Sequence, residues 1–164
     1  MHRFLVTVAL AAVAAVGLYI GVGSAKAPGG RTFRLVETEK GSTFHFIDEA
    51  PLAPTSHNPD ELMPSPGDRF AITQPLATLR GQRAGTIYAE CTFLTGGQRA
   101  ALHCVGTMGL KGGQLALDTR LKGFGRVTKI AITGGTGAYE GARGSITSIE
   151  RRNNTSLDTI HLLP

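Results

Sequence analysis

Residues 86–121 read TIYAECTFLTGGQRAALHCVGTMGLKGGQLALDTRL, and small or apolar side chains occupy every second position through most of this segment. A two-residue period is typical of a β-strand that turns one face toward a core. Residues 95–98 and 111–112 interrupt the period, and both breaks are rich in the residues that turns favour. The segment therefore predicts three consecutive antiparallel strands joined by short turns.

The first hairpin of this meander has a register that the alternation specifies. Folding it about residues 97–98 sets Phe93 opposite Leu102, because both belong to the apolar face. The same register sets Cys91 opposite Cys104. Directly opposed residues on one face bring their Cβ atoms to about 4.5–5.5 Å, which is close to disulfide reach.

The second hairpin continues the same apolar face, because its register sets Met108 opposite Leu115. Shorter alternating runs flank the meander on both sides, separated by glycine-rich turns. These runs cover residues 32–38, 43–48, 69–73, 127–133, 145–151 and 157–162. About eight or nine short strands of this kind predict an all-β domain, either a barrel or a sandwich.

The N-terminus has the pattern of a secretory signal peptide. A basic start is followed by an apolar run from Phe4 to Ile20 and then by small residues up to position 27. We expect residues 1–27 to be removed during export to a secreted or extracytoplasmic location, with a retained membrane anchor as the alternative. Residues 28–164 then form a single domain with a proline-rich loop at 50–67.

Charge and composition argue against nucleic-acid binding. Of the 17 Lys and Arg residues, Arg3 and Lys26 lie in the signal segment, so the remaining excess over 12 acidic residues is small and scattered. The chain has no Trp and three Tyr, too few aromatic residues for a base-stacking surface. The five histidines show no metal-site spacing. We therefore expect no nucleic acid, no metal and, after cleavage, no membrane as partner.

The late segment GGTGAYEGARG, residues 134–144, lacks the glycine spacing and the following helix that a dinucleotide site needs. It resembles the late motif of dirigent proteins and of the related allene oxide cyclases. Residues 66–70 (PGDRF) are similar to a segment of allene oxide cyclases, and Pro75-Leu76 looks like the Pro-Leu of dirigent proteins. The resemblance runs over about residues 32–162.

This resemblance implies an eight-stranded antiparallel up-and-down barrel with a hydrophobic pocket that acts on reactive apolar intermediates without a cofactor. It also implies a homodimer or homotrimer. A glutamate in the first strand of allene oxide cyclases matches Glu37 or Glu39, and the dirigent motif includes an arginine that matches Arg143. The pocket cysteine of allene oxide cyclases corresponds to Cys91, which gives an alternative to the disulfide.

Glu37 shares its strand face with Phe33 and Leu35, so it is a candidate general acid or base with a raised pKa, or else a residue at the barrel rim. Arg143 is the second catalytic candidate, as a group that polarises an oxygen at the barrel mouth, or else an arginine on the surface of a hairpin. The apolar face predicts the residues that bind the substrate. They are Phe33, Leu35, Phe93, Leu102, Met108 and Leu117.

Three functional hypotheses follow. In the first, the barrel binds a small apolar or phenolic molecule and steers its cyclisation or coupling, as a cofactor-independent cyclase or isomerase. In the second, the cavity holds a lipid or another small molecule and performs no chemistry. In the third, side chains fill the interior and the barrel serves a structural or interaction role. Fold-level likeness alone does not choose among them.

Overall fold

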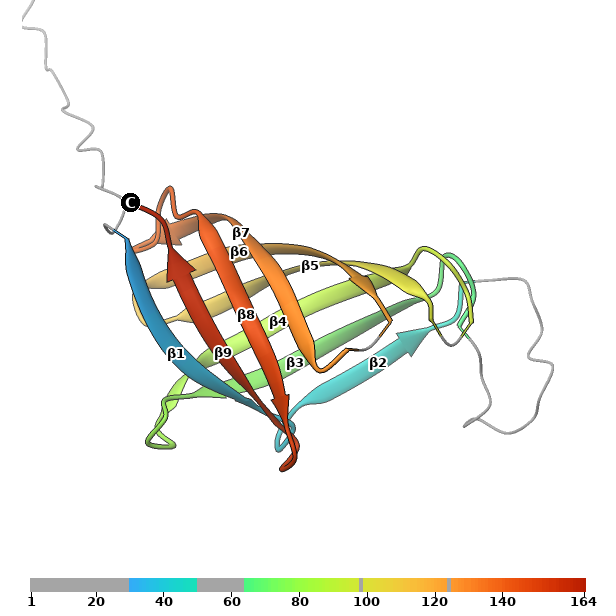
Figure 1. Ribbon diagram of the computed structural model, residues 1–164, viewed down its shortest axis with the longest axis horizontal. Coiled ribbons are helices and arrows are strands. Elements are labelled where there is room, and N and C mark those ends of the chain that lie inside the picture. The colour runs from blue at the N-terminus through green and yellow to red at the C-terminus, as the bar shows by residue number, and fades with distance from the viewer. Residues whose placement is uncertain (1–29, 50–63, 98, 124) are drawn as a thin grey trace, which may run out of the picture.

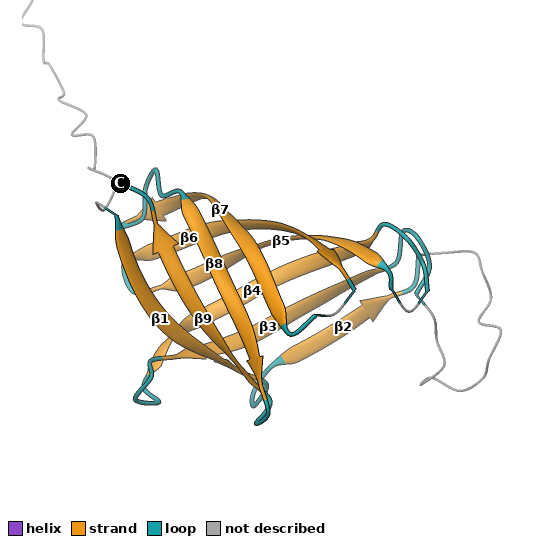
Figure 2. Cartoon of the chain, viewed as in Figure 1, coloured by secondary structure: helices purple, strands orange, loops and turns teal. Residues whose placement is uncertain are grey.

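The computed structural model describes residues 30–49, 64–97, 99–123 and 125–164, and within these ranges it contains β-strands and no helix (Figures 1 and 2). The strands form one antiparallel sheet. They are β1 (Arg31–Thr38), β2 (Thr43–Ile47), β3 (Arg69–Ala77), β4 (Arg83–Phe93), β5 (Ala101–Leu110), β6 (Gly113–Lys122), β7 (Val127–Gly137), β8 (Gly144–Arg151) and β9 (Thr155–Leu162).

Strand β1 closes the sheet into a barrel. It pairs with β9 along its whole length and with β3 at its end, where Val36 lies opposite Ala77 and Glu37 opposite Leu76. Strand β2 then continues along β3 beyond the end of β1 (Figure 1). Eight strands therefore form a closed barrel, with β2 as one extra strand, and the predicted fold class is confirmed. Closure pairs most of the edge that an open sheet would expose, and the extra strand β2, which pairs with β3, keeps one edge that no described strand covers.

The meander has the register that the sequence predicts. Phe93 pairs with Leu102 and Cys91 with Cys104 across β4 and β5. Met108 pairs with Leu115 across β5 and β6. Because a slip of one residue would turn the whole apolar face outward, the alternation alone suffices to specify this register.

Cys91 and Cys104 form a disulfide, with their Cα atoms 4.0 Å apart. The bond links residues 13 positions apart on one hairpin. We expect the double variant Cys91→Ser/Cys104→Ser to lose about 3 kcal/mol of unfolding free energy, because an open loop of this length restores entropy to the unfolded chain. Guanidinium titrations of both proteins measure this loss. Two reactive thiols in the denatured, unreduced wild-type protein would contradict the bond itself.

Inward-facing side chains form two core clusters. The larger one is built on buried aliphatic side chains from the eight strands of the barrel, and the smaller one contains the disulfide and three large apolar side chains. The larger cluster includes Leu35, Leu76, Ile87, Met108, Leu115, Leu117, Ile132, Ile146, Ile160 and Leu162. The smaller cluster comprises Phe70, Cys91, Phe93, Ala100, Leu102 and Cys104.

The glycine-rich segment is part of a strand in its first half. Strand β7 runs through Gly137, four residues beyond the predicted end at 133, and a turn then places Tyr139 in the larger core cluster. The extension is possible because glycines allow close backbone approach: a Cβ on Gly113 would collide with the carbonyl oxygen of Thr136. The glycines of this segment thus allow β6, β7 and the following turn to pack closely against one another.

Two sequence expectations lie outside the described residues. They are the signal peptide at 1–27 and most of the proline-rich loop, of which residues 64–67 are described. The described ranges hold no helix with the length and apolar character needed to cross a membrane.

Candidate functional site

A cavity of about 390 Å³ lies inside the barrel between the two core clusters, since its wall includes Ile87 and Leu117 of the larger and Cys91 and Cys104 of the smaller. This volume falls in the range of small-molecule sites. One side of the wall is apolar and the other is polar. The apolar side is formed by Ile72, Ile87, Ala89, Leu117, Leu121 and Ile130, and the polar side by Glu37, Glu39, Gln74, Arg126, Thr128, Ser148, Glu150 and Ser156.

Neighbouring strands arrange the polar side in rows. Glu37 on β1 pairs with Ser156 on β9, which pairs in turn with Glu150 on β8. A second row lies two residues further along these strands. It contains Asp158, which pairs with Leu35 on β1 and with Ser148 on β8. Alternate residues of one strand share a face, so Asp158 points into the barrel like Ser156. The two rows place the carboxyl groups of Glu37 and Asp158 diagonally across β1 and β9.

Glu37 is partly buried where it lines the cavity. Loss of solvation, together with the smaller effect of the nearby Asp158 charge, raises its pKa from 4.5 to about 8. A glutamic acid with such a pKa is largely protonated at neutral pH. It can therefore donate a proton to a bound molecule and recover one afterwards.

Asp158 is the most deeply buried charged side chain of the described residues, with 1% of its surface exposed. Burial raises its pKa from 3.8 to about 6, and the nearby hydroxyl of Ser148 moderates that rise. Neither carboxyl oxygen forms a hydrogen bond of standard geometry with a described residue. Because the two acids titrate as a pair, together they retain about one proton near neutral pH.

The structure places the eight predicted site residues in different surroundings. Glu37 and Leu117 line the cavity. The other predicted binding residues are packed in the core: Leu35 and Met108 belong to the larger cluster with Phe33 against it, whereas Phe93 and Leu102 belong to the smaller one. These side chains point inward, as the alternation predicts. They are packed within the two core clusters and do not line the cavity.

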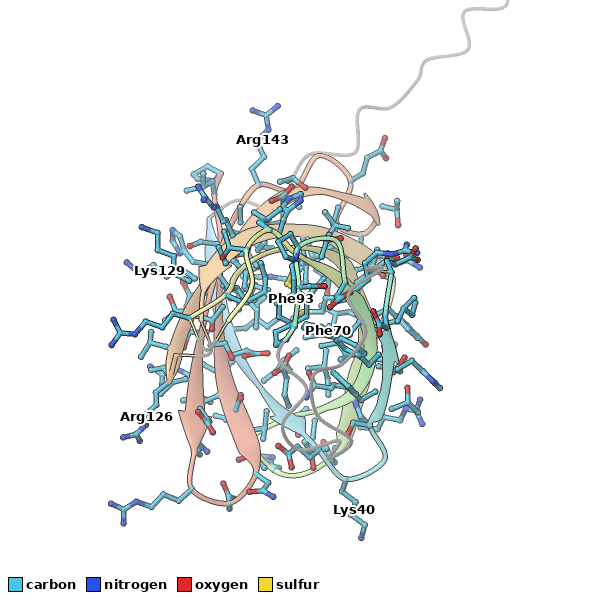
Figure 3. All side chains as sticks on the ribbon, turned by 90° about the vertical axis from the view of Figure 1, so that its right-hand side faces the viewer. Lys40, Phe70, Phe93, Arg126, Lys129 and Arg143 are labelled. Carbon is cyan, nitrogen blue, oxygen red and sulfur yellow. A yellow bond between two sulfur atoms is a disulfide. The ribbon has the colours of Figure 1, made fainter. Side chains whose placement is uncertain are left out.

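Arg143 lies at the other end of the barrel from Glu37. Its carbonyl accepts a hydrogen bond from the backbone N–H of Leu163, just past β9, at the level of Arg31 on β1. Six residues of β1 separate that level from Glu37, a distance of about 20 Å. The Arg143 side chain is exposed and points away from the barrel (Figure 3). The two candidate catalytic residues are therefore not brought together.

The disulfide forms part of the cavity wall, so neither cysteine offers a thiol there. Figure 3 looks onto one end of the barrel and shows Phe70 and Phe93 inside it, around the smaller cluster. The disulfide is consistent with an extracytoplasmic location. Sequence reasoning missed Asp158 as a site residue. The signal was available, because Asp158 has the same parity as Ile160 and Leu162 in an alternating strand.

Several solved structures share this fold. A pyocyanin demethylase has a TM-score of 0.63 at 19% identity, over 80% of this chain and 99% of that protein. A pterocarpan synthase dirigent protein has a TM-score of 0.57 at 18% identity, covering 84% of this chain and 97% of its own. The Diels–Alderase AbmU from Streptomyces koyangensis has a TM-score of 0.59 at 16% identity, over 82% of this chain and 63% of AbmU.

No family model and no curated protein matches the sequence. The similarity to solved structures nevertheless shows that the chain shares its fold with dirigent proteins and with cyclase barrels, as the resemblance of the glycine-rich segment predicts. At these identities the likeness establishes the fold and leaves the reaction to be argued from the site.

Proposed function

We propose that this protein is exported and that its cavity binds a small apolar or phenolic molecule and steers a cofactor-free cyclisation or coupling. The observation that carries the proposal is the cavity itself, apolar on one side and bearing a protonated Glu37 on the other. An apolar wall can hold a flexible molecule in one near-attack geometry. Glu37 would then protonate or polarise the group at which charge develops.

Fold neighbours support the same reaction class. Among the proteins with this fold are a pterocarpan synthase dirigent protein and a Diels–Alderase, whose names denote synthesis and cycloaddition. The N-terminal segment and the disulfide support export. A second candidate function, storage or transport without chemistry, uses the same cavity and differs only in whether Glu37 transfers a proton.

Native mass spectrometry of the purified protein tests the cavity directly. We expect a retained organic molecule in the wild type and its loss in Ala89→Phe, because a phenyl ring from β4 would occupy the cavity. The matched control is Ala71→Phe on the neighbouring strand β3. Ala71 is paired with Glu90 and does not line the cavity, so this variant should retain the molecule.

Glu37→Gln separates the two candidate functions once the retained molecule is identified. It keeps the size of the side chain and removes the transferable proton. We expect retention to persist and turnover to fall at least about a hundredfold, which is the usual contribution of a general acid or base. Unchanged turnover would remove the catalytic role of Glu37, and equal retention in Ala89→Phe and Ala71→Phe would refute the cavity as the binding site.

A further inference from the structure

Acidic side chains gather on one side of the cavity without basic partners. Glu37, Glu39 and Glu150 line it, and Asp158 lies in the adjoining row. The ion pairs formed among the described residues all lie elsewhere: Arg69 with Glu49 and with Glu90, and His103 with Asp118.

Arg126 is the one basic residue of the described cavity lining. Its side chain extends outward from the barrel wall, away from the interior (Figure 3). Although the backbone N–H of Glu150 donates a hydrogen bond to the Arg126 carbonyl, the ion pairs found among the described residues do not include one between the Arg126 guanidinium and these acids. Glu39 and Glu150 are exposed, so the buried acids are Glu37 and Asp158, which share about one proton near neutral pH and leave one negative charge that a bound molecule can balance.

Asp158 gives an independent indication of what the cavity holds. Its carboxyl group is fully buried, faces the barrel interior and makes no hydrogen bond of standard geometry with the described residues. Buried carboxylates are normally paired or hydrogen-bonded, because an unpartnered charge in a protein interior is costly. Ser148 and Thr128, which share its row, both line the cavity. Of the described residues, only the Ser148 hydroxyl acts on this carboxyl group as a donor, and a positive charge on a ligand seated against Glu37 would compensate it further.

We propose that the cavity selects ligands with an apolar body and a positively charged nitrogen, which lies against Glu37 with Asp158 behind it. This inference rests on the proposed function and names the chemical class of its ligand. The apolar body would lie on the wall formed by Ile72, Ile87 and Leu117. An anionic ligand would meet like charges, and a neutral ligand would leave the carboxyl pair uncompensated.

A metal ion fits the site less well than an organic cation. The described residues contain no group of three or more His, Cys, Asp or Glu side chains placed to hold a metal. The opposite wall is mainly aliphatic, with the Thr119 hydroxyl and the Gln74 amide beside it and no carboxylate, whereas an organic cation can use both walls at once. The charge and the apolar surface together therefore favour an amine-bearing hydrophobic molecule.

Three probes with the same naphthalene body test the inference: 1-naphthylmethylamine, 1-naphthylmethanol and 1-naphthoate, a cation, a neutral molecule and an anion at neutral pH. Calorimetric titration of the full exported chain should give the amine an affinity at least about tenfold higher than that of the alcohol. Naphthoate should bind more weakly than either. Asp158→Asn and Glu37→Gln should each reduce the advantage of the amine several-fold and leave the alcohol nearly unchanged.

The control is Asp118→Asn, which removes one negative charge from the outside of the barrel, where Asp118 pairs with His103. It should leave the preference intact. Equal or tighter binding of the alcohol or of naphthoate overturns the charge selectivity and leaves the proposed binding cavity standing. An amine preference that survives both Asp158→Asn and Glu37→Gln overturns the assignment to this pair. If the wild type binds none of the three probes, the proposed function itself fails together with this inference.

Discussion

Raising the pH from 4 to 8 is expected to lower the free energy of unfolding by about 3 kcal/mol or more, through the Glu37–Asp158 pair. Burial raises the pKa of Glu37 to about 8 and that of Asp158 to about 6. The unfolded chain ionises both groups near their ordinary values of 4.5 and 3.8. Between these limits the folded state binds more protons than the unfolded state, so stability falls as the pH rises.

Guanidinium titrations at a series of pH values measure this slope. The double variant Glu37→Gln/Asp158→Asn replaces both acids by neutral side chains of similar shape, so its stability should vary far less over the same window. At pH 8 it should also exceed the wild type in stability, because no buried charge has to be accommodated. A wild-type profile that is flat or rises between pH 4 and pH 8 would show that the two carboxyl groups are solvated in the folded protein.

Gly135→Ala is expected to destabilise the barrel by about 3 kcal/mol, or to prevent folding. Gly135 lies under the turn that follows β7. A Cβ there would collide with the carbonyl oxygen of Tyr139 and lie 2.8 Å from that of Gln114. Both are backbone atoms, so relief requires movement of the turn that seats Tyr139 in the larger core cluster. Thermal unfolding followed by circular dichroism measures the loss.

The neighbouring Gly134→Ala is the matched control for this prediction. The nearest atom to a Cβ on Gly134 is the Ala116 Cβ at 3.9 Å, an ordinary contact. The free energy of unfolding of Gly134→Ala should stay within about 0.5 kcal/mol of the wild-type value. Equal effects of the two alanines would mean that the glycine pair acts through chain flexibility rather than through close backbone approach at one position.

The two predictions together separate the roles of the two most distinctive features of the chain. The glycine-rich segment acts in packing, because its glycines allow the close approach of β6, β7 and the turn before Arg143. The candidate site instead lies at the opposite end of the barrel, where burial raises the pKa of Glu37 and that of Asp158. The stability loss of Gly135→Ala therefore tests the glycine-rich segment, and the pH dependence of the unfolding free energy tests the Glu37–Asp158 pair.

The alternation of residues 86–121 by itself determined the meander, its register and the pairing of Cys91 with Cys104. Local patterns suffice there, because the strands are consecutive and a one-residue slip would expose the apolar face. The parity of Glu37 with Leu35 predicted an inward side chain but left a position at the barrel rim open, and the structure places Glu37 in the cavity wall.

Only the tertiary structure decided which inward side chains line a void. Met108 and Leu102 face inward as predicted, yet they are packed solid, because the curvature of the closed barrel sets how far opposite walls are separated. The pairing of β9 with β1 also places Asp158 next to Glu37, although 121 positions separate the two residues in the sequence. Arg143 lies at the other end of the barrel. Such contacts depend on the stagger of strands around the barrel, which no local period encodes.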